Sequence, residues 1–156
     1  MGELPTRALS LYAPWAYALL HLGKDIENRN WLRGDRGFSG DAKFRGEFWI
    51  HASLFGGEAG RKLGDLRAEC DAVWRVAVDS DVDAILAWSL RARGKIVGRA
   101  RVVDAVTASG SRWFCGPVGL VVAEPVALAE QVPAKGALGF WAVPPDVLVQ
   151  LRQGPE

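Results

Sequence analysis

The sequence predicts a small α+β barrel, and two observations carry this prediction. Strand patterns occupy both ends of the chain and enclose a region of helical patterns between residues 56 and 90. The chain also has 18 glycines and 8 prolines, residues that form the corners of a small curved sheet. Its 156 residues suffice to bury a core without disulfides or metal, so we expect a single domain over residues 1–156.

Strand patterns in the first third of the chain enclose one short helix. Arg7–Tyr12 (RALSLY) alternates apolar and polar residues, which is typical of a strand with one buried face. Pro14 suits the first turn of a helix, and the apolar residues that follow predict about two helical turns. Residues 25–31 and the aromatic, β-branched residues 48–53 are predicted strands. Residues 32–46 are rich in Gly, Arg and Asp and predict an exposed, mobile loop.

Helices and then further strands are expected in the rest of the chain. Apolar residues recur at spacings of three and four over residues 63–77, which predicts an amphipathic helix. A second short helix is expected over residues 85–90, and together the two helices form a helical insertion of about residues 56–90. Pro144 and Pro145 end the last strand and can open a terminal helix. The later strands are predicted over residues 93–106, 118–128 and 138–143.

Composition excludes several classes of protein. With 49% hydrophobic and 24% charged residues, the chain does not resemble a disordered one. No apolar run approaches the roughly 18 residues of a membrane span, and the N-terminal pattern is not that of a signal peptide. We therefore expect a cytoplasmic protein with no membrane partner. Cys70 and Cys115 provide neither a disulfide framework nor a metal motif, so we expect no metal and no other cofactor.

Six short segments carry most of the information about function. They are ALSLYAPWA (8–16), GKDIENRNW (23–31), IHAS (50–53), GKIVG (94–98), WFCGP (113–117) and GALGFW (136–141). In this order they resemble ASCH-domain proteins, whose opening is similar to A-L-S-x-x-x-P-W-A followed by G-K-x-x-E-N-R-x-W. The resemblance implies a PUA-like fold, which is a compact, partly open β-barrel with short flanking helices. It also implies RNA or nucleobase binding, or hydrolysis of RNA or acylated cytidine, and the fold alone does not choose between them.

Three charged residues in the second segment are candidates for a binding or catalytic site. On a strand, Glu27 and Arg29 share one face, so Glu27 can orient Arg29 toward a phosphate or a base edge. Lys24 falls on the opposite face and supplies a point charge or, when desolvated, a base. In the family's acylcytidine hydrolases a similar Lys is followed three residues later by a Thr, and here Glu27 stands at that position. Lys24 and Glu27 are the candidate catalytic pair of an enzyme; an ordinary surface ion pair is the alternative.

A run of basic residues over 91–101 is the clearest electrostatic feature of the sequence. The run contains five basic residues, Arg91, Arg93, Lys95, Arg99 and Arg101. On a continuous strand all five side chains would share one face, as in a phosphate-binding track. The alternative is that they protect a sheet edge or pair with residues 65–90, which carry six acidic and two basic side chains. The net charge of +1 therefore conceals a basic run beside an acidic helical region.

Tryptophans and one histidine complete the candidate site. Trp15, Trp31 and Trp113 belong to the family segments and are candidates for stacking on bases, whereas we expect the core to hold the tryptophans at 49, 74, 88 and 141. His51 is either a hydrogen-bonded core residue or a ligand contact. We expect a protein that binds RNA, other single-stranded nucleic acid, or a modified nucleobase or nucleoside in a basic cleft. A small hydrolase of single-stranded RNA or of a modified nucleoside is the alternative. The predicted binding residues are Lys24, Arg29, Trp31, Trp15, His51, Lys95, Arg99, Arg101 and Trp113.

Overall fold

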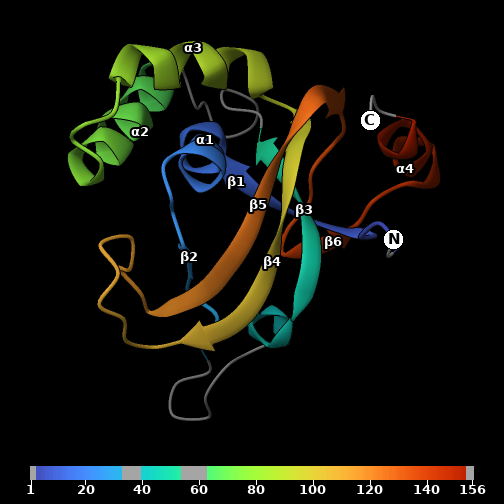
Figure 1. The fold of residues 1–156 in the computed structure, drawn as a ribbon, viewed down its shortest axis with the longest axis horizontal. Helices are drawn as coiled ribbons and strands as arrows, with labels where there is room; N and C mark the ends of the chain where they lie inside the picture. Colours follow the sequence, from blue (N-terminus) through green and yellow to red (C-terminus); the bar gives the residue numbers. More distant parts are fainter. Residues whose placement is uncertain (1–2, 33–39, 54–62, 154–156) are drawn as a thin grey trace.

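A curled six-stranded sheet forms the body of the protein (Figure 1). The computed structural model describes residues 3–32, 40–53 and 63–153. The strands are β1 (Arg7–Tyr12), β2 (Ile26–Arg29), β3 (Gly46–Ser53), β4 (Lys95–Val106), β5 (Val118–Pro133) and β6 (Phe140–Ala142). They are ordered β2-β5-β4-β3-β1-β6, and only β1 and β3 run parallel. The protein is therefore α+β, with the sheet of a small, partly open barrel, as the sequence predicts.

Helices cover two sides of the sheet (Figure 1). They are α1 (Ala13–His21), α2 (Leu63–Val76), α3 (Val82–Ala92), α4 (Pro145–Arg152) and the 3-10 helix η2 (Gly40–Lys43). In Figure 1, α2 and α3 form an outer layer beyond α1, while α4 lies apart from them near the C-terminus. The Asp81 side chain begins α3 by accepting hydrogen bonds from the backbone N–H groups of Asp83 and Ala84. None of the described helices has the length and apolar character required to cross a membrane.

The largest buried cluster joins the sheet to α1. It contains Leu9 from β1, Phe48 and Ile50 from β3 and Leu120 from β5, together with Leu19 from α1. A second cluster lies between the sheet and α4, and a third lies between α1 and the outer helices. The apolar residues that alternate along the strands, and those spaced by three and four over residues 63–77, therefore point into these three clusters. This burial explains why the sequence pattern predicted the strands and helices correctly.

Most predicted elements are present, with shifted ends. The strand predicted over residues 118–128 continues to Pro133. Its register against β4 shifts, and Glu124 adopts a positive φ of 54°, so the alternation of buried and exposed residues is interrupted and does not mark where the strand ends. The loop predicted over residues 32–46 contains η2, and its residues 33–39 lie outside the described residues. Residues 56–62 of the predicted helical insertion also lie outside them.

The predicted continuous basic face over residues 91–101 is wrong. Arg91 belongs to the last turn of α3, and Arg93 lies in the turn before β4, where Gly94 adopts a φ of +76°. Only Lys95, Arg99 and Arg101 lie on the strand. Period-two counting fails here because a helix end and a turn separate the first two basic residues from the strand.

One of the four tryptophans expected in the core is instead exposed. Trp74 on α2 is 41% exposed, whereas Trp49 and Trp141 are buried and Trp88 packs partly buried against the main core. The outer helix layer turns the Trp74 ring toward solvent, although its helical spacing matches that of the buried Cys70 and Val73.

Gly98 on β4 lies close to both α1 and β5. A Cβ at this position would stand 2.6 Å from the carbonyl oxygen of Val126 and 2.7 Å from a methyl carbon of Leu20. We predict that Gly98→Ala lowers the free energy of unfolding by about 1–3 kcal/mol, measured by urea denaturation, because the backbone oxygen cannot move aside easily. Gly110→Ala is the matched control, because no atom lies within 4 Å of its Cβ position. Equal losses in the two variants would contradict this explanation.

Candidate functional site

A buried carboxylate on β2 is held between two cations. Glu27 is 8% exposed; its Oε1 accepts a hydrogen bond from Lys24 Nζ at 2.8 Å, and its Oε2 accepts one from Arg29 Nε at 3.0 Å. Lys24 is equally buried, at 4% exposure. Burial by itself raises the pKa of Glu27, but the charges and hydrogen bonds of Lys24 and Arg29 bring that pKa below its usual value. The carboxylate is therefore ionised at neutral pH.

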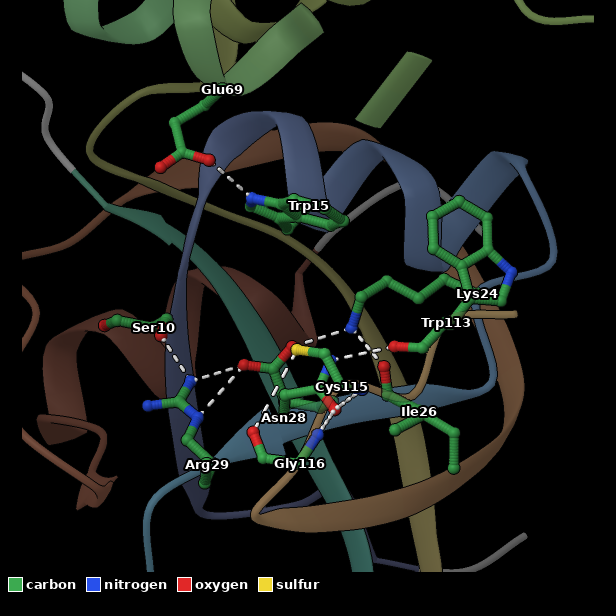
Figure 2. A network of polar contacts seen from close by, with 11 residues as sticks. Ser10, Trp15, Lys24, Ile26, Asn28, Arg29, Glu69, Trp113, Cys115 and Gly116 are labelled. Carbon is green, nitrogen blue, oxygen red and sulfur yellow. Dashed lines mark hydrogen bonds and ion pairs between the residues drawn. The ribbon is translucent and has the colours of Figure 1, made fainter. Parts of the chain in front are cut away.

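Lys24 reaches the carboxylate from outside the strand. The chain leaves α1 through Gly23, which has a φ of +74°, and β2 begins only at Ile26. Strand alternation therefore does not govern Lys24, and the predicted opposite face is wrong for this residue. Its ammonium group also donates to the carbonyl oxygen of Ile26 (Figure 2). Together with the hydrogen bond to Glu27 Oε1, this contact holds the side chain against β2.

Arg29 connects β2, at one edge of the sheet, to β1 near the opposite edge. Its Nη2 donates to the carbonyl oxygen of Ser10 on β1 at 2.9 Å, although β1 and β2 are not neighbours in the sheet (Figure 2). The guanidinium carbon also lies 5.3 Å from the ring centroid of Trp31, which in turn lies 6.0 Å from the ring of Phe140 on β6. Side chains thus connect β2 to β1 and β6 across the open side of the barrel.

Asn28 fixes the turn over residues 113–117. Its Oδ1 accepts hydrogen bonds from the backbone N–H groups of Cys115 at 2.8 Å and Gly116 at 3.1 Å, and its Nδ2 donates to the Trp113 carbonyl oxygen at 2.8 Å (Figure 2). One amide side chain therefore satisfies three backbone groups of a turn that lies 85 or more residues away in the sequence. Asn28 therefore holds the 113–117 turn against β2.

His51 on β3 forms a second buried polar contact, with Ser10 on the neighbouring strand β1. It is 2% exposed; its Nε2 lies 2.8 Å from the carbonyl oxygen of Ala134 and its Nδ1 lies 2.9 Å from Ser10 Oγ. Since a carbonyl oxygen only accepts, we assign the proton to Nε2, so that Nδ1 accepts from the Ser10 hydroxyl. Trp141 Nε1 completes the chain by donating to Ser10 Oγ at 3.1 Å. Burial lowers the pKa of His51 below its usual value, which is consistent with a neutral ring.

One cleft of about 1450 Å³ is lined by six of the polar residues just described, Ser10, Lys24, Glu27, Asn28, Arg29 and His51. This volume exceeds the roughly 300–1000 Å³ of a typical small-molecule pocket, so the cleft has room for a nucleotide and part of its neighbours. The described residues that line it carry four basic side chains and one acidic side chain, Glu27, a balance of +3. The basic residues are Lys24, Arg29, Arg93 and Lys135. The cleft is therefore strongly positive within a chain whose net charge is +1.

The structure brings together four of the nine predicted binding residues. Lys24, Arg29, Trp15 and His51 line the cleft. Trp113 lies 5% exposed behind its wall, with its ring 6.4 Å from that of Trp15 in an edge-to-face arrangement. Trp31 packs on Arg29 and Phe140 and is not among the lining residues.

The three basic residues on β4 lie outside the cleft as the described residues define it. Arg99 pairs with Glu47 at 3.9 Å, and Arg101 pairs with Glu47 at 3.6 Å and with Glu124 at 2.9 Å. Lys95 is likewise not a lining residue. These ion pairs follow the alternative in which the basic residues meet acidic partners, although the partners come from β3 and β5 instead of residues 65–90. The basic strand and the charged network do not form one surface.

Sequence reasoning missed several lining residues. Ser10 and Asn28 lie inside the segments that resemble ASCH-domain proteins but have no charge, and Lys135 stands alone in a Gly- and Ala-rich stretch. The parallel register of β1 and β3 places Ser10 opposite His51, and no local sequence pattern reveals this pairing. Within the described part of the chain, no group of three His, Cys, Asp or Glu side chains could hold a metal ion.

A scan of the chain against protein-family models finds no match, and a search of curated proteins finds none either. The resemblance to ASCH-domain proteins therefore depends on the six short segments alone.

Loss of the Glu27 charge should destabilise the protein. We predict that Glu27→Gln lowers the free energy of unfolding by about 3–5 kcal/mol, because Lys24 and Arg29 then lack a counter-charge in a buried site. Glu124→Gln is the control: it removes an exposed pair with Arg101 and should change the free energy by less than about 1 kcal/mol. Chemical denaturation measures both, and a Glu27 variant as stable as the Glu124 variant would show that the network is not structural.

Stability should also fall in mild acid because of His51. Its pKa in the folded protein lies below the usual 6.5, so the unfolded chain takes up a proton first as the pH falls. We predict that the free energy of unfolding decreases as the pH falls from about 7.5 through 6.5 toward the lowered pKa. His51→Gln should flatten this dependence. His21, whose pKa is also lowered by burial, adds to the same slope, so His21→Gln serves as the comparison. An unchanged slope in the His51 variant would contradict the assignment.

Proposed function

We propose that the protein binds single-stranded RNA, or a nucleotide of another single-stranded nucleic acid, in this cleft. The observation that carries the proposal is the Lys24–Glu27–Arg29 network within a cleft whose lining has a charge balance of +3. Cations attract the phosphate backbone, while a fixed carboxylate can accept hydrogen bonds from base N–H groups. This combination suits a ligand that carries both an anionic backbone and polar bases.

The recess favours an unpaired base over a duplex. The side chains of Lys24 and Glu27 are only 2% and 10% exposed, so a ligand group must enter the cleft to reach them. A paired base is held in its stack, whereas an unpaired base can turn outward and present its edge. Trp15 offers an aromatic ring beside the charged groups, and its indole nitrogen is already bound to Glu69 Oε2 at 2.8 Å (Figure 2). Its ring is therefore held in one orientation.

The curled sheet and its flanking helices are consistent with the PUA-like fold that the ASCH resemblance implies. Families with that fold commonly bind RNA or a modified base, which favours the same class of ligand. The Lys24, Glu27 and Arg29 positions match the family segment G-K-x-x-E-N-R-x-W residue by residue. We accordingly extend the proposal to membership of this family.

Hydrolysis is the weaker candidate. An acid–base role for Lys24 and Glu27 needs a carboxyl group that gains and loses a proton near neutral pH, but the pKa of Glu27 lies below its usual value. Both carboxylate oxygens are also engaged by cations. We therefore expect no turnover when the protein is incubated with single-stranded RNA or acylated cytidine, and a product that disappears in Glu27→Gln would favour the hydrolase instead.

The binding test is fluorescence anisotropy with a labelled single-stranded RNA at several salt concentrations. We predict an affinity that falls steeply with salt, and weaker binding to a duplex of the same sequence. Lys135→Ala, an exposed change at the cleft, should weaken binding several-fold and reduce the slope of log Kd against log salt by about 0.7. Arg99→Ala is the charge-matched control, because Arg99 lies outside the cleft and pairs with Glu47.

Two outcomes would contradict the proposal. Absence of RNA binding by the unaltered protein at low salt would exclude it directly. Equal weakening by Lys135→Ala and Arg99→Ala would show that general surface charge, and not the cleft, attracts the RNA.

A further inference from the structure

The segment over residues 134–139 forms one rim of the cleft and is held at both ends. At its start, the Ala134 carbonyl oxygen accepts a hydrogen bond from His51 Nε2 at 2.8 Å, and the Ala134 N–H donates to the Gly94 carbonyl oxygen at 3.0 Å. Just after its end, the Phe140 N–H donates to Asp41 Oδ2 at 2.8 Å. The rim is therefore a fixed part of the fold, although it lies outside the sheet.

The middle of the rim lies directly on the Ser10–His51 pair. A Cβ on Gly136 would stand 2.7 Å from both Ser10 Oγ and His51 Cε1, so glycine permits this close approach. Gly136 therefore lies against the Ser10–His51 pair, whose polar atoms are already bound to Trp141 and to Ala134 of the rim, so the pair supports this part of the rim.

This fixed rim presents a fully exposed leucine at the cleft. Leu138 is 98% exposed, the largest exposure of the described large hydrophobic residues, and it lines the cleft together with Lys135 three residues earlier. A single exposed leucine on a surface is ordinary. Leu138 differs because the segment that carries it is anchored at both ends and because it borders a cleft that also holds four basic side chains. Its side chain has little to lose in the free protein and apolar contact to gain from a ligand.

We infer that Leu138 and Lys135 together clamp the bound nucleotide. Leu138 packs on the face of an unpaired base whose edge is directed toward Glu27, and Lys135 pairs with the adjacent phosphate. The inference rests on the proposed function and adds to it the part of the ligand that each rim residue contacts. An apolar side chain and a cation on the same rim match the two parts of a nucleotide, a planar base and its phosphate.

The test distinguishes binding to the bases of the RNA from binding to its ribose-phosphate backbone. Binding is measured by anisotropy, at low salt, for a short single-stranded RNA and for an abasic ribose-phosphate oligomer of the same length. We expect Leu138→Ser to weaken RNA binding about tenfold, as burial of a leucine side chain predicts, and to leave binding of the abasic oligomer unchanged. Lys135→Ala should weaken binding of both oligomers. Thermal unfolding of Leu138→Ser should match that of the unaltered protein, because the side chain has almost no contacts to lose.

Val78→Ser is the matched control, since Val78 is 63% exposed and is not a lining residue of the cleft as described. Equal RNA binding by Leu138→Ser and the unaltered protein would overturn the clamp and leave the proposed function in place. The same holds if Leu138→Ser weakens binding of both oligomers equally, or if Val78→Ser weakens RNA binding as much. If the unaltered protein binds no RNA, the clamp and the proposed function both fall.

Discussion

The ionised carboxylate of Glu27, held between Lys24 and Arg29, is the interaction on which the rest of the structure depends. Lys24 and Glu27 are buried and Arg29 is partly buried, so these charges lose much of their hydration, and only close pairs such as those at 2.8 Å offset that loss. Because Arg29 also binds the Ser10 carbonyl oxygen, the network joins an edge strand to β1 across the opening of the curled sheet. The same charges therefore stabilise the open side of the barrel and form part of the cleft.

Around this network the site is built in layers of different chemistry. Neutral polar side chains fix the walls: Asn28 binds the 113–117 turn, and His51 binds the rim at Ala134. Exposed residues of the rim, Lys135 and Leu138, remain available to a ligand. The buried polar side chains already form hydrogen bonds within the protein, so their positions are fixed before a ligand binds. This reduces the conformational entropy lost on binding.

The basic run shows where a charge pattern misleads. The sequence reveals the sign of Arg99 and Arg101, but their partner Glu47 lies about fifty residues earlier and meets them only because β3 pairs with β4. The positive charge of the cleft instead comes from three separate segments, which carry the basic residues at positions 24 and 29, at 93 and at 135. A local count of basic residues cannot detect a surface assembled in this way.

The sequence by itself determined the α+β class and the approximate positions of the strands and of the α-helices, because these follow from local periodicity. It also singled out Lys24, Glu27 and Arg29 as candidate site residues, in the short segment that resembles ASCH-domain proteins. Only the tertiary structure decided that Lys24 turns toward Glu27, that Ser10 meets His51, and that the rim carries Leu138 at the cleft. Such contacts depend on strand order and register, which join residues far apart in the chain and leave no mark in local composition.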